Sequence, residues 1–118
     1  MRSQNIKSLD HQFSNSEYDA IACVLPLLVY VPNVTLQKKK AASDSIAKIN
    51  RRAVTFSNHE LNAIIESVEL SVQLLSGKRP DLLQRISRDT EWLAEMRAQF
   101  FVLNGLLQEF QEILQEFG

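Results

Sequence analysis

The last third of the chain carries apolar residues at alternating spacings of four and three positions, which is the spacing of one helix face. No proline interrupts residues 81–117, and Gly105 is the only glycine there. The series is broken only by Asp89, and it comprises Leu82, Ile86, Leu93, Met96, Phe100, Leu103, Leu107, Phe110, Leu114 and Phe117. The pattern predicts a long amphipathic helix over residues 80–117. An alternative is a helix that stops and restarts at Asp89, a favourable N-cap residue.

An unbroken helix of this length would reach about 55 Å at 1.5 Å per residue. A compact domain of this size has a radius of gyration near 13 Å, so the helix would extend past its own bundle. The simplest way to bury the apolar surface that the bundle leaves exposed on this helix is a symmetric contact with a second copy of the chain. We therefore expect a homodimer with a coiled-coil-like self-association seam of Leu93, Met96, Phe100, Leu103, Leu107, Phe110, Leu114 and Phe117. A break near Asp89 would instead fold residues 92–117 back as a fifth helix.

A nearly identical phrase occurs twice, as FSNSEYDAI at residues 13–21 and FSNHELNAI at residues 56–64. Each copy contains a capping box, in which Ser14 or Ser57 is the N-cap and a glutamate follows three residues later. The phenylalanine before each cap can pack on the first helical turn as a hydrophobic staple. Convergent capping, duplication of a two-helix unit and a reused ligand motif all remain open as explanations. Each of them predicts that a helix begins at both copies.

The rest of the pattern favours an all-α fold. The 3 glycines and 3 prolines are too few for the many turns of a β-sandwich. Pro26 should bend or restart the first helix. We predict one domain over residues 1–118, a helical bundle of four or, with the break, five helices, in which residues 1–12 are a flexible N-terminal segment. The predicted helices span residues 15–30, 36–52, 58–76 and 80–117.

Charge is unevenly distributed along the chain. Residues 1–59 carry eight Lys/Arg against four Asp/Glu, or +4, and residues 60–118 carry five against ten, or −5. The two halves can attract each other, or the basic face of the second helix can meet an anionic partner such as nucleic acid. The candidate basic patch comprises Lys38, Lys39, Lys40, Lys48, Arg51 and Arg52. No aromatic residue lies among residues 38–52 to stack on bases.

Catalytic and metal-binding motifs are absent from the sequence. His11 and His59 have no Cys or carboxylate at metal-ligand spacing, and Cys23 is the only cysteine, which excludes an internal disulfide and fits a reducing compartment. Six residues separate Arg52 from His59, and this spacing resembles the Arg-x4–6-His motif of the HEPN ribonucleases. That resemblance covers two residues and implies, as an alternative function, an all-helical ribonuclease with Arg52 and His59 acting on RNA.

The expected function follows from these patterns. We expect a small, non-enzymatic, cytoplasmic protein without cofactor, metal or membrane segment. It would act by binding another protein as an inhibitor, adaptor or assembly subunit, as small bacterial or phage accessory proteins do. Nucleic-acid binding through the basic second helix is the first alternative, and the HEPN-like ribonuclease is the second.

Overall fold

The computed structural model describes the backbone of residues 8–32 and 34–117, and the side-chain surroundings of residues 10–32 and 34–112. The described part is mostly helical and compact, as predicted, and it contains six α-helices rather than four or five. In chain order the elements are β1 (Ser8–Asp10), α1 (Asn15–Val24), the 3-10 helix η1 (Leu25–Tyr30), α2 (Leu36–Asn50), β2 (Thr55–Ser57), α3 (Asn58–Leu75), α4 (Pro80–Ile86), α5 (Thr90–Ala98) and α6 (Phe100–Phe117).

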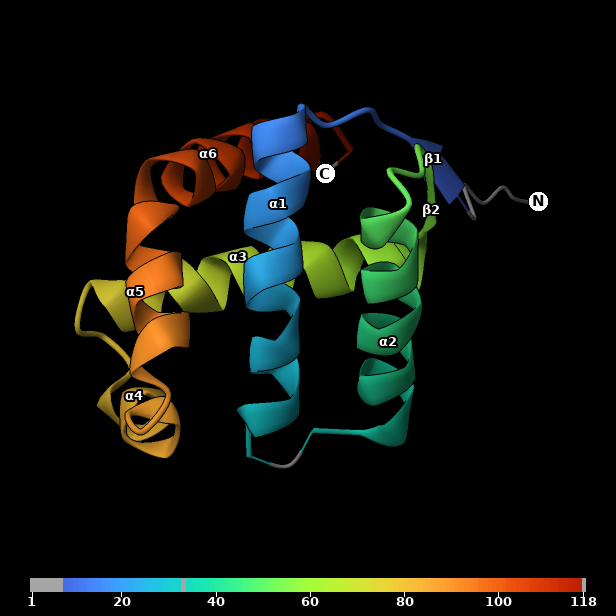
Figure 1. Cartoon of the computed structure of the whole chain (residues 1–118). Helices are drawn as coiled ribbons and strands as arrows, with labels where there is room; N and C mark the ends of the chain where they lie inside the picture. Colours follow the sequence, from blue (N-terminus) through green and yellow to red (C-terminus); the bar gives the residue numbers. More distant parts are fainter. Residues whose placement is uncertain (1–7, 33, 118) are drawn as a thin grey trace.

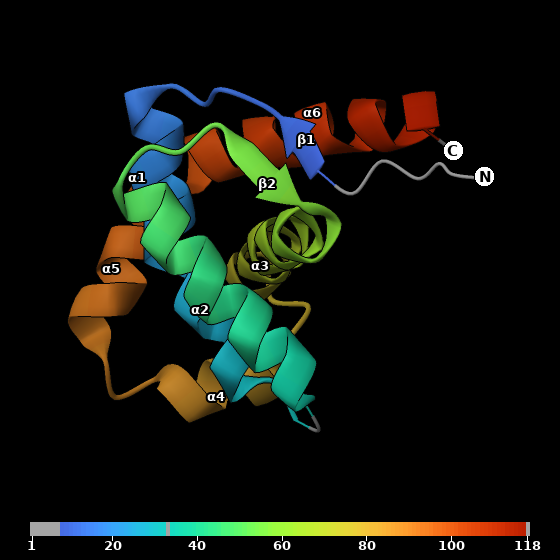
Figure 2. The same cartoon turned by 90° about the vertical axis from the view of Figure 1, so that its right-hand side faces the viewer.

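Helix α3 is the central element. It packs against α1, η1, α2 and α6, and Figure 1 shows it crossing behind α1 and η1. Figure 2 looks along α3 and shows α2 and α6 on different sides of it. The radius of gyration is 14.2 Å. Among the described residues, no helix combines the length and the hydropathy that crossing a membrane requires.

Both copies of the repeated phrase begin a helix, as predicted. The Ser14 hydroxyl accepts a hydrogen bond from the Glu17 backbone N–H, and the Ser57 hydroxyl accepts one from that of Glu60. Each glutamate side chain reaches back to the N–H of its cap, which completes two capping boxes. Pro26 has the predicted effect, because the α-helical pattern ends at Val24 and continues as a 3-10 helix.

The two copies also meet in space. The Phe13 and Phe56 rings pack edge to face with their centroids 5.9 Å apart. Phe13 contacts Tyr18 at 5.4 Å, which is the predicted staple of the first copy, and Phe110 of α6 at 6.1 Å. These rings form an aromatic cluster that joins α1, β2 and α6.

Residues 8–10 differ from the flexible N-terminal segment that we predicted for residues 1–12. They form β1, which pairs antiparallel with β2 so that Leu9 lies opposite Phe56. The backbone N–H of His11 extends the contact by donating to the carbonyl of Val54 at 2.7 Å. Residues 1–7 of that segment lie outside the described residues.

The prediction of a single long helix over residues 80–117 is wrong, because the chain bends twice and forms α4, α5 and α6. At the first bend Asp89 acts as an N-cap, and its side chain accepts from the backbone N–H of Trp92 at 3.1 Å. At the second bend Gln99 closes α5, and its N–H bonds to the carbonyls of Glu95 and Met96. The bends turn α6 back onto α1 and α3, so the chain buries its own apolar series.

Candidate functional site

The basic side chains of α2 are largely neutralised within the chain. Four of the six predicted patch residues form ion pairs: Lys38 with Glu66 (3.2 Å), Lys40 with Asp44 (3.3 Å), Lys48 with Glu60 (2.6 Å) and Arg52 with Asp19 (2.7 Å). Among the described residues, none forms an ion pair with Lys39 or Arg51. Lys38–Glu66 and Lys48–Glu60 connect the basic half of the sequence to the acidic half. Attraction between the halves therefore accounts for part of the charge asymmetry.

The Lys48–Glu60 pair is the least exposed of these contacts. Its side chains are 24% and 11% exposed, and Lys48 Nζ also donates to the carbonyl of Thr55 at 3.0 Å. Burial alone would raise the pKa of Glu60, but the hydrogen bonds from Lys48 and from the Ser57 backbone outweigh it and lower the pKa below its ordinary value. Lys48 thus ties the end of α2 to the start of α3.

Arg52 and His59, the residues of the HEPN resemblance, have different neighbours. Arg52 adopts φ 58° in the turn after α2, and its guanidinium lies over the Tyr18 ring at 5.1 Å while pairing with Asp19. His59 lies in the first turn of α3 beside α2. His59 lines two hollows between α2 and α3, and Arg52 lines neither of them.

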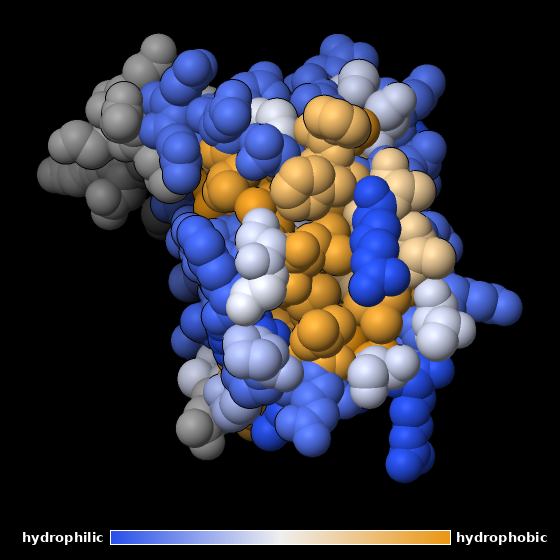
Figure 3. Space-filling view, turned by 90° about the vertical axis from the view of Figure 1, so that its left-hand side faces the viewer, coloured by the Kyte–Doolittle hydropathy of each residue, from blue (hydrophilic) through white to orange (hydrophobic). Residues whose placement is uncertain are grey.

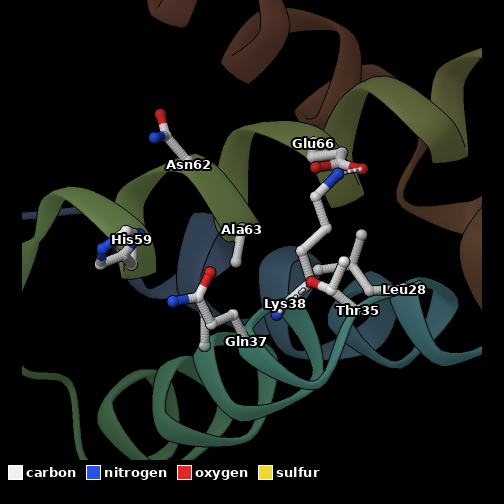
Figure 4. A pocket seen from close by; sticks show the side chains of 9 residues that line it. Leu28, Thr35, Gln37, Lys38, His59, Asn62, Ala63 and Glu66 are labelled. Carbon is white, nitrogen blue, oxygen red and sulfur yellow. Dashed lines mark hydrogen bonds and ion pairs between the residues drawn. The ribbon is translucent and has the colours of Figure 1, made fainter.

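A small hollow between α2 and α3, which we call the α2–α3 groove, has a volume of about 310 Å³ (Figure 4). The Lys38–Glu66 ion pair connects its two walls. A second hollow of about 250 Å³ continues it past His59. The groove is lined by Leu28, Thr35, Gln37, Lys38, Ala41, His59, Asn62, Ala63 and Glu66. Its lining combines amide, imidazole and charged groups with the apolar side chains of Leu28, Ala41 and Ala63.

Cys23 is not placed for nucleophilic chemistry. The side chain is buried, and burial followed by the charge of Glu95 raises the pKa of its thiol to about 12. The thiolate is the reactive form, so it is scarce at neutral pH. No group of three or more His, Cys, Asp or Glu side chains in the described ranges is arranged to hold a metal ion.

The predicted self-association seam lies mainly inside the chain's own core. Leu93, Met96, Leu103 and Phe110 are buried, and Phe100 and Leu107 are half-buried. The side chains of Leu114 and Phe117 lie outside the described residues. The seam is therefore not an exposed stripe, because the bends at Asp89 and Gln99 let α6 pack on α1 and α3.

The opposite side of the same segment is exposed, and the apolar series did not point to it. Ala94 and Ala98 are exposed on α5, and Phe101, in the first turn of α6, has a side chain that is 90% exposed. Exposed charges flank these residues. We call the set Glu91, Ala94, Arg97, Ala98 and Phe101 the outer α5 surface. The signal in the sequence was a second, shorter four-and-three spacing from Ala94 to Phe101.

The outer α5 surface belongs to a broadly apolar side of the molecule. Figure 3 looks onto the side that carries α4, α5, the end of α3 and the start of α6, and a wide apolar area occupies its centre. Half-buried apolar side chains on these elements include Val72, Leu75, Leu83 and Phe100. Helix α5 packs on α1 and α6, which leaves its outer side uncovered.

Comparison of the chain with protein-family models, curated proteins and solved structures gives no match.

Proposed function

We propose that the protein is non-enzymatic and acts in the cytoplasm by binding another protein, as an inhibitor, adaptor or assembly subunit, through the outer α5 surface. The observation that carries the proposal is Phe101, which is 90% exposed in the first turn of α6. Helix α6 begins on the side of the molecule that has the wide apolar area (Figure 3). Soluble monomers rarely leave large contiguous apolar patches in water, and such patches mark interaction sites. Exposed aromatic side chains are also frequent anchors of protein interfaces.

Nucleic-acid binding through α2 has less support. A phosphate contact would compete with the intramolecular ion pairs of Lys38, Lys48 and Arg52. If α2 nevertheless bound nucleic acid, labelled RNA or DNA would bind with an affinity that falls steeply with salt. Changing Lys39 and Arg51 to Gln would then reduce that affinity.

Affinity capture from the native cells tests the proposal. The baits are the wild type, Phe101→Ser and, as a matched control, Leu36→Ser, because Leu36 is 83% exposed on α2, outside the outer α5 surface. Circular dichroism first verifies that all three baits have the same helical content. We expect a protein that the wild type and Leu36→Ser retain and Phe101→Ser does not. Identical retained proteins for all three baits would contradict the proposed surface.

A further inference from the structure

Charge on the outer α5 surface is arranged symmetrically about Ala94. Glu91 precedes Ala94 by three residues, and Arg97 follows it by three. Both charged side chains are exposed, and neither forms an ion pair with a described residue. An acid, a small residue and a base therefore follow one another along one side of a single helix.

Two copies of this charge pattern are complementary only when the two helices run in opposite directions. If two α5 helices pair antiparallel about Ala94, Glu91 of each copy faces Arg97 of the other, and both charges are matched twice. A parallel pair would place like charges together. A two-fold axis generates such a self-complementary contact from one surface. Resting on the proposed function, we infer that the partner is a second copy of this chain, docked with its α5 antiparallel about Ala94.

The side chains on α5 permit this approach. Leu93 and Met96 point into the chain's own core and stay there. Ala94 and Ala98 are small, so two helix axes can come near the lower end of the usual 8–10 Å separation. Figure 2 shows α5 at the edge of the molecule.

Phe101 extends the contact beyond α5. It lies at the start of α6, directly after the bend at Gln99, and its 90% exposed side chain adds apolar surface next to α5. A stable interface buries roughly 800 Å² on each partner, more than a nine-residue helix offers. The apolar area of Figure 3 supplies the remaining surface.

Charge reversal tests the pairing. Dimer dissociation constants are measured by sedimentation equilibrium for the wild type, Glu91→Lys, Arg97→Glu and the double variant. We expect a dimeric wild type, a loss of about tenfold in affinity for each single variant, and recovery to within about threefold in the double variant. An equimolar mixture of the two single variants should also dimerise, because each then faces its opposite charge. Glu69→Lys, an exposed reversal on α3, is the control and should leave the dimer unchanged.

Two results would overturn the inference. One is a wild type that stays monomeric at high micromolar concentration, and the other is a double variant no stronger than the single ones. Neither result contradicts the proposed function, which fails only if capture is insensitive to Phe101→Ser. The two experiments therefore separate a wrong partner from a wrong surface.

Discussion

The two capping-box glutamates occupy equivalent positions in opposite electrostatic surroundings. Glu60 accepts hydrogen bonds from the N–H of its cap at 2.8 Å and from Lys48 at 2.6 Å. Glu17 accepts from the N–H of its own cap at 2.7 Å, but the carboxylate next to it is Glu109 of α6. The capping box of α3 thus has a cation beside its glutamate, whereas that of α1 has a second carboxylate.

Glu60→Gln should destabilise the fold at neutral pH by about 1–2 kcal/mol, because it removes a charge-assisted capping contact. The pKa of Glu60 is lowered from 4.5 in the folded state, so its contribution is complete above that value and is lost as the pH falls through the lowered pKa. Urea denaturation from neutral to acidic pH should show the two proteins converging in acid. Glu66→Gln, which removes a more exposed ion pair, is the control and should have a smaller effect. A difference independent of pH would contradict the assignment.

Glu109→Gln should have the opposite effect. Its partly desolvated position and then the charge of Glu17 raise the pKa of Glu109 above 4.5. A raised carboxyl pKa means that the folded state binds the proton more tightly, so folding stability decreases as the pH rises through that pKa. The variant should therefore be more stable than the wild type at neutral pH and equal to it in acid. Thermal denaturation at both pH values measures this, with Glu69→Gln as the control. A less stable variant at neutral pH would refute the interpretation.

At the scale of elements, a hydrogen bond from a side chain of α5 to the backbone of α1 links the two helices. Trp92 Nε1 donates to the carbonyl of Cys23 at 2.7 Å, close to the point where α1 becomes a 3-10 helix. The Trp92 ring also lies 5.7 Å from that of Tyr30. Near Pro26 the α-helix gives way to a 3-10 helix. The Cys23 carbonyl in this region accepts its hydrogen bond from Trp92, a residue of another helix.

Trp92→Phe should cost about 1–3 kcal/mol of unfolding free energy, because the Cys23 carbonyl loses a partner in a partly buried setting. Unfolding must be followed by circular dichroism, since Trp92 is the only tryptophan. Tyr30→Phe removes a polar group from the neighbouring ring and serves as the control, with an expected change within about 0.5 kcal/mol. Equal effects of the two substitutions would show that the hydrogen bond contributes little.

The sequence predicts a helix end where one residue or a few adjacent residues determine it. The caps at Ser14 and Ser57, the change at Pro26 and the end of α3 at Gly77, with φ 80°, all follow from one or a few adjacent residues. Pairing of β1 with β2 and the bend at Gln99 depend on contacts distant in sequence, which spacing does not reveal. An apolar series likewise cannot distinguish a core from an interface. For that reason the spacing predicts a contact between copies for side chains that lie mainly in the core of one chain.

At the scale of the whole molecule, the aromatic cluster identifies Phe110 as a core residue. Phe110→Ala should cost about 3–5 kcal/mol of unfolding free energy, as large-to-small changes of buried aromatic residues do. Phe101→Ala is a matched control, because it removes the same side chain from the same helix at a position that is 90% exposed. Its expected effect on stability is within about 0.5 kcal/mol. Chemical denaturation measures the free energy of unfolding of both variants. Equal losses of this free energy would contradict the burial of Phe110.

The aromatic cluster also has a consequence for biosynthesis. Phe13, Phe56 and Phe110 are translated early, midway and late, yet their rings pack together. A nascent chain that has released α1, α2 and α3 from the ribosome still lacks α6, which covers α1 and α3. Contacts between distant segments delay folding, and uncovered apolar surface promotes aggregation in the interval. The domain therefore closes only after α6 has emerged, so a ribosome that stalls before α6 holds a chain whose α1 and α3 lack the cover of α6.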